Sequence, residues 1–109
     1  MKPGLTKAAL SEPRRRLVEL MQSINFGRIE DLIVVGGDPV LDPLPRMVQE
    51  IKFGGDNGPR PELDANNFLL KAQVIELFQH LDQLGDGTIE AIEVKHGLPF
   101  RMILAKDAC

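Results

Sequence analysis

The chain has 109 residues, of which 43% are hydrophobic and 27% charged, and its formal net charge is −3. This length allows one domain with a single modest core, and the composition is ordinary for a soluble globular protein. The acidic balance and the absence of Trp and Tyr disfavour nucleic acid as a partner, because a basic surface and stacking platforms are both missing. No apolar run approaches the roughly 20 residues that span a bilayer, and no secretory signal opens the chain, so we expect a cytoplasmic protein without membrane contact.

A helix is predicted over 12–24, after a loose leader. Ser11 can cap its first turn, and Pro13 suits the first helical positions. Apolar residues then recur at the spacing of one helical face. This stripe consists of Leu17, Leu20, Met21 and Ile24.

A β-hairpin follows the first helix. Segment 28–35 is rich in β-branched residues and precedes Gly36 and Gly37, a pattern that predicts a strand and a turn. A three-residue loop with glycine last would pair Val34 with Asp38. Two prolines then interrupt the return strand, which favours an edge position in the sheet or a bulge.

The second half of the chain repeats this order. The return strand resumes over 46–53, and the Gly- and Pro-rich stretch 54–66 is the clearest loop. A second apolar stripe predicts a helix over about 67–83, with polar residues just before it as possible caps. In the second hairpin, a three-residue loop of Lys95, His96 and Gly97 would pair Val94 with Leu98 and Ile92 with Phe100.

The two hairpin segments are similar in sequence. Residues 27–40 and 87–100 align without a gap, and parts of the two helical segments match at an offset of 57. We therefore predict an α+β fold, a two-layer sandwich made by internal duplication of a helix–β-hairpin unit (αββ-αββ), with a four-stranded antiparallel sheet and both helices on one face. The predicted single domain covers 1–109, with repeat one over about 12–53, the loop over 54–66 and repeat two over about 67–105.

Two outward-facing positions differ between the repeats. Glu93 and Lys95 in the second correspond to Ile33 and Val35 in the first. Because side chains alternate along a strand, this second face is expected to be solvated in one repeat and apolar in the other. Ile33 and Val35 are therefore expected to pack under the leader, under the 54–67 loop or against another subunit.

Segment 82–93 carries acidic residues at a familiar spacing. Asp82, Asp86 and Glu93 occupy the first, fifth and twelfth positions, and Gly87 occupies the sixth. The segment resembles the calcium loop of the EF-hand family, and the resemblance implies that these carboxylates would bind Ca²⁺. The alternative is a plain turn from helix to strand, because the residues after the glycine alternate as a strand does.

Arginines are the second group of candidate binding residues. Arg14, Arg15 and Arg16 open the first helix, where their charges oppose the helix dipole. Joined by Arg28, Arg46 or Arg101, they could contact an anion or nucleic acid, although a solvated charge run is the alternative. The equivalent acids Glu30 and Glu90 could form a dicarboxylate, or they could be exposed structural residues.

Other chemistry has little support in the sequence. No serine lies in a nucleophile turn, the two histidines have no partners at ligand spacing, and no phosphate loop is present, so we expect no catalytic residues, no metal and no cofactor. The favoured role is a small non-catalytic interaction module that binds a protein partner or forms a homodimer. The alternatives are a calcium-binding loop at 82–93 and a weak nucleic-acid or anion binder. The candidate interaction surface consists of Ile33, Val35, Arg14, Arg15, Arg16, Arg46 and Arg101.

Overall fold

The structure is a computed structural model that describes residues 10–55 and 71–105. The predicted leader, most of the loop, the start of the second predicted helix and the C-terminal tail lie outside these ranges. Within them, no helix is long and apolar enough to cross a membrane. Two helices and five strands follow in the order α1 (Glu12–Ile24), β1 (Gly27–Val35), β2 (Asp38–Val40), β3 (Arg46–Gln49), α2 (Ala72–Leu84), β4 (Gly87–Lys95) and β5 (Leu98–Ile103).

Local chemistry sets the limits of both helices. The Ser11 side chain caps α1 by accepting a hydrogen bond of 3.4 Å from the backbone N–H of Arg14, and a proline lies in the first turn. Asn25 and Gly85 end α1 and α2, and their φ values of 62° and 68° break the helical geometry. The helix predicted over 12–24 is confirmed.

The two halves of the chain keep a constant spacing. Helices α1 and α2 have 13 residues each and begin at Glu12 and Ala72, which is an offset of 60. Strands β1 and β4 begin at Gly27 and Gly87 with the same offset. The helix bounds therefore lie at an offset of 60, whereas the sequence match within the helices is at 57. Three pairs of buried helix residues correspond at an offset of 60, namely Leu17 with Leu77, Val18 with Phe78, and Met21 with Leu81.

The sheet is antiparallel and has five strands rather than the predicted four. Its order is β2-β1-β4-β5, and β3 also pairs with β1. Val40 of β2 lies opposite Ile33, whereas Arg46 of β3 lies opposite Glu30. The chain leaves the sheet between these pairs, over residues 41–45, because prolines have no N–H to donate to the ladder. The predicted return strand is thus two short strands along one edge.

Both hairpins turn on two residues, so the predicted three-residue loops are wrong. Val35 lies opposite Asp38, and Gly36 and Gly37 between them have φ values of 60° and 80°. Two successive positive φ angles match the type I′ turn, whose twist suits paired strands. The predicted pairing of Val34 with Asp38 is therefore one residue out of register.

The second hairpin contains a bulge in addition. Lys95 lies opposite Leu98, and the register then shifts between Glu93 and Val94. The extra residue on β5 is Phe100, which lies opposite no β4 residue in the register and is 59% exposed. The predicted pairing of Ile92 with Phe100 is wrong, because Met102 lies opposite Ile92.

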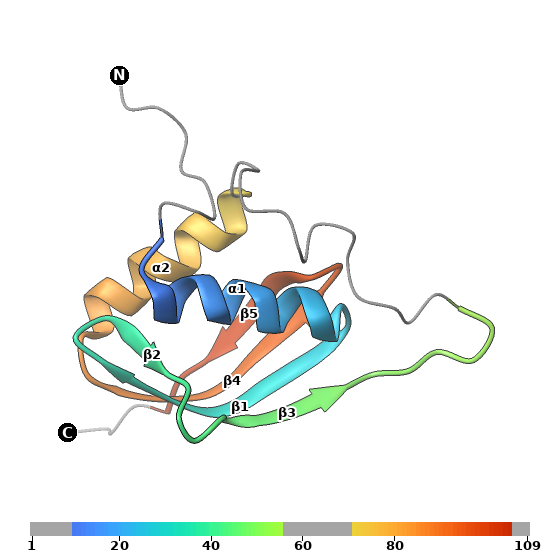
Figure 1. Cartoon of the computed structure of the whole chain (residues 1–109), viewed down its shortest axis with the longest axis horizontal. Helices are drawn as coiled ribbons and strands as arrows, with labels where there is room; N and C mark the ends of the chain where they lie inside the picture. Colours follow the sequence, from blue (N-terminus) through green and yellow to red (C-terminus); the bar gives the residue numbers. More distant parts are fainter. Residues whose placement is uncertain (1–9, 56–70, 106–109) are drawn as a thin grey trace.

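The core lies between the helices and one face of the sheet. Figure 1 shows α1 and α2 on the same side of the strands. Residues Ile29, Leu32 and Val34 of β1 are buried beneath them, as are their β4 counterparts. No described helix covers the opposite face, which we call the open face of the sheet. The β4 residues in this core are Ile89, Ile92 and Val94.

Candidate interaction site

The open face has an apolar end formed by Ile33 and Val35. Both alternate along β1 with buried residues, and they are 50% and 58% exposed. Ile33 lies opposite Val40 on one side and Thr88 on the other. The leader and most of the loop that were predicted as possible covers fall outside the described residues. The described chain therefore presents a small apolar surface at this end of the open face.

The other end of the open face carries paired charges. The Arg28 Nε lies 2.6 Å from one carboxylate oxygen of Glu30, and the Arg46 Nε lies 3.2 Å from the other. Two strands away, the Arg101 Nε donates to a Glu93 carboxylate oxygen at 2.8 Å. The hydrogen bond from Arg28 lowers the pKa of Glu30, against a smaller opposing effect of burial, and raises the pKa of Arg28.

A hollow of about 450 Å³ lies among these charges. Glu30 and Glu90 both line it, so the structure brings the two equivalent acids to one place. Arg46 and Arg101 do not line it, although each pairs with a carboxylate that does. The hollow is therefore bordered by side chains of both charges, and it is not a positively charged site for an anion.

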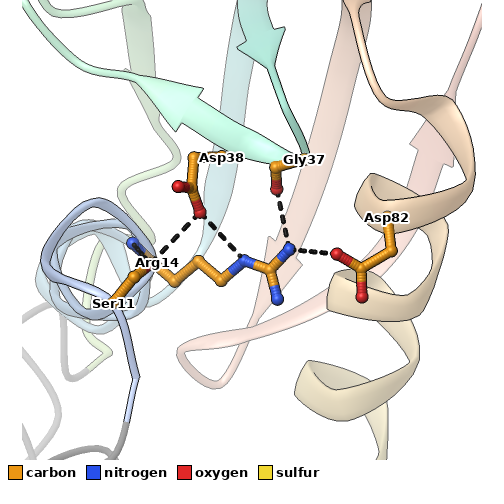
Figure 2. Close-up of polar contacts among 5 residues, drawn as sticks. All are labelled: Ser11, Arg14, Gly37, Asp38 and Asp82. Carbon is orange, nitrogen blue, oxygen red and sulfur yellow. Dashed lines mark hydrogen bonds and ion pairs between the residues drawn. The ribbon is translucent and has the colours of Figure 1, made fainter.

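Arg14 lies on the helical side of the sheet, where it joins three elements (Figure 2). Its guanidinium donates to the Gly37 carbonyl oxygen at 2.9 Å, and its Nε lies 3.2 Å from a carboxylate oxygen of Asp38. It also pairs with Asp82 of α2 and lies 5.1 Å from the centre of the Phe78 ring. Only 18% of its side chain is exposed. We call this group the Arg14 clamp, and its role is to hold α1, the first hairpin turn and α2 together.

The remaining arginines of α1 also have carboxylate partners. Arg15 lies 3.5 Å from Glu19 one helical turn away, and Arg16 lies 3.3 Å from Asp42. The seven predicted surface residues thus separate into two groups. Ile33, Val35, Arg46 and Arg101 lie on strands, while Arg14, Arg15 and Arg16 lie on α1 and do not join the open face.

The EF-hand geometry is not formed at residues 82–93. The segment after Asp86 is the nine-residue strand β4, so no exiting helix follows the loop. Asp82 pairs with Arg14, and Asp86 accepts a hydrogen bond of 2.8 Å from the Gly36 backbone N–H. Within the described ranges, no group of three His, Cys, Asp or Glu residues is placed to hold a metal ion. The plain turn from helix to strand is the reading that the structure supports.

One further concave surface was not predicted. A groove of about 640 Å³ lies between α2 and β5, with Leu77 and Leu84 on one wall and Met102 and Leu104 on the other. Within the described residues, only the first return segment is followed by a further strand, and this difference between the two halves is the sequence signal that could have revealed the groove.

Comparison with known proteins gives no assignment. No protein-family model, curated protein or solved structure matches the chain, so its function must be inferred from its own residues.

Proposed function

We propose that this protein is a small non-catalytic interaction module that forms a homodimer through the open face of its sheet. The observation that carries the proposal is the exposure of Ile33 and Val35 in the strand next to the sheet centre. Two β-branched side chains next to each other on a flat face lose contact with water when a second flat face covers them.

The charges at the other end of the open face support a symmetric pairing. In a two-fold interface the same patch meets itself, so it must be complementary to its own copy. The open face meets this condition because Arg28, Arg46 and Arg101 alternate across it with Glu30 and Glu93. A surface of one sign would repel its copy, whereas mixed charges can exchange partners across the interface.

We also propose that the domain is a two-layer sandwich built by internal duplication. Two reciprocal hydrogen bonds support this. The Gly37 N–H donates to the Gly85 carbonyl oxygen at 2.8 Å, and the Gly97 N–H donates to the Asn25 carbonyl oxygen at 2.9 Å. A shift of sixty residues turns each bond into the other. The central strands agree, since Ile29 opposite Ile92 becomes Leu32 opposite Ile89 under the same shift.

The duplication supplies the test of dimerisation. Ile33→Glu and Val35→Lys give the first half the residues that the second half has at Glu93 and Lys95. The sheet already tolerates these side chains at equivalent positions, so we expect the double variant to stay folded and to keep the circular dichroism spectrum of the wild type. Light scattering should show a dimer for the wild type and a monomer for this variant.

A matched control changes charge away from the open face. Gln79 is exposed on α2, so Gln79→Glu should remain dimeric. A wild type that stays monomeric at every concentration measured would contradict self-association and would leave a different protein as the partner of the open face. A folded double variant that remains dimeric would contradict the open face as the interface.

A further inference from the structure

The α2–β5 groove adjoins a part of β4 that lacks a second neighbouring strand. Residues 91–95 of β4 pair with β5, whereas the first half, 87–90, pairs with β1 alone among the described residues. Leu84, Leu104 and His80 line the groove, and the Leu84 side chain lies beside Gly87 at the start of β4. A free strand edge beside a groove that is lined by both apolar and polar side chains offers backbone hydrogen bonds and a place for side chains.

The first half of the chain shows what fills the equivalent place. Gly27–Glu30 of β1 pair with Arg46–Gln49, which are β3. A Cβ atom built on Gly27 would lie 2.0 Å from the Val48 carbonyl oxygen of that strand. The nearest described atoms to a Cβ atom built on Gly87 belong to the Leu84 side chain, at 3.0 Å or more. Within residues 10–55 and 71–105, no strand takes in the second half the position that β3 takes in the first.

β3 covers the C-terminal end of α1 as well as the edge of β1. Met47 lies opposite Ile29 and packs against the core. The Gln49 side chain donates to the Ile24 carbonyl oxygen at 3.2 Å. The counterpart of Ile24 at an offset of sixty is Leu84, which lines the groove. A strand bound there would meet the same type of surface that β3 meets.

We propose that the α2–β5 groove binds an extended segment of a protein partner. The segment adds a strand beside residues 87–90 of β4, and it places one long unbranched or γ-branched side chain, methionine or leucine, in the groove as Met47 is placed in the first half. This inference rests on the internal duplication proposed above but is independent of self-association through the open face.

The chain supplies its own probe. A synthetic peptide of residues 44–53, Leu-Pro-Arg-Met-Val-Gln-Glu-Ile-Lys-Phe, contains β3 and can be titrated into the isotope-labelled full chain. We expect NMR shift changes at the methyl groups of Leu84, Met102 and Leu104 and at the amides of residues 87–90. A Met47→Ala version of the peptide should bind roughly tenfold more weakly, because its groove side chain is lost.

Variants of His80 test the groove without disturbing the core, because His80 is exposed. Its counterpart is Leu20, so His80→Leu should strengthen peptide binding several-fold, and His80→Glu should weaken it by a similar factor. Ile33→Glu should leave peptide affinity unchanged, which separates this proposal from dimerisation. Binding that shifts only open-face residues, or equal affinity of the two peptides, would overturn the proposal. The full chain could also form an oligomer that His80→Glu abolishes and Ile33→Glu preserves. In that case the segment bound in the groove would come from a second copy of this chain and not from a different protein.

Discussion

The two halves of the molecule share a scaffold and differ at their edges. Each half has a helix of 13 residues, a strand of nine residues and a two-residue turn, at a constant offset. After the turn they diverge. The first half continues through β2 and β3, whereas the described part of the second continues through β5, which has a bulge at Phe100. The conserved parts of this comparison are those that build the core, and the divergent parts are those that form surfaces.

The same contrast holds for side chains. Ile33 and Val35 on the open face become Glu93 and Lys95 in the second half, and Glu93 pairs with Arg101. On the helical side, Arg14 of the clamp becomes the buried Val74. These exchanges leave the backbone in place. We infer that the shared helices and strands determine the fold, whereas the side chains that differ determine which surfaces can bind and how α1 contacts the first hairpin turn and α2.

The largest expected effect tests whether the two halves are equivalent in the core. Leu17 and Leu77 occupy matching buried positions and are 0% and 5% exposed. Leu17→Ala and Leu77→Ala should each lower the free energy of unfolding by about 3 kcal/mol, through lost burial and a residual cavity. Urea denaturation measures both. Costs that differ by more than about 2 kcal/mol would show that the halves do not share the core equally.

The second effect concerns the Arg14 clamp, which only the first half has. Arg14→Ala removes a hydrogen bond to Gly37 and ion pairs to Asp38 and Asp82, so we expect a loss of about 2 kcal/mol in unfolding free energy. Arg15→Ala is the matched control, because its exposed pair with Glu19 is worth at most about 0.5 kcal/mol. Equal losses in the two variants would mean that the clamp contributes no more than an ordinary surface pair.

Periodicity predicted the parts of the fold that local patterns determine. The helix over 12–24 and the strand character after Asp86 followed from the spacing of apolar residues and were correct. The turns were not, because the sequence contains no signal that His96 adopts a φ of 55°. The same residues are also compatible with a three-residue loop that ends in glycine. A difference of one residue in loop length shifts every cross-strand pair.

The candidate site was predictable only where a single strand defines it. Alternation along β1 placed Ile33 and Val35 on the face away from the core. The role of Arg14 could not be predicted, since its partners Gly37 and Asp82 lie 23 and 68 positions away and meet only in the folded chain. Arg101 was predicted as a surface cation, but its pairing with Glu93 depends on the bulge.

The third effect tests the difference at the edge. A Cβ at Gly27 would lie 2.0 Å from the Val48 carbonyl oxygen and 2.9 Å from the Ile24 side chain, so β3 must shift in Gly27→Ala. We expect a loss of more than about 1 kcal/mol and faster hydrogen exchange in β3. Gly87→Ala meets only the end of the Leu84 side chain and should stay within about 0.5 kcal/mol of the wild type. Similar costs would mean that β3 does not lie against β1 in solution.

The smallest effect tests the paired charges on the open face. The pKa of Glu30 is lowered from its usual 4.5, mainly by the hydrogen bond from Arg28. A lowered carboxyl pKa stabilises the folded state above the unfolded pKa, and this contribution disappears as the pH falls through the folded pKa. Glu30→Gln should therefore reduce stability slightly at neutral pH and flatten its decline below about pH 4.5.

Thermal unfolding between pH 7 and pH 3 measures this flattening. Glu90→Gln is the control, because Glu90 is the equivalent residue and forms no ion pair within the described part of the chain. It should leave the acid limb of the stability profile as in the wild type. If Glu30→Gln also leaves it unchanged, Arg28 and Glu30 do not hold each other in solution, and the charged end of the open face is then as free to exchange partners as any solvated surface.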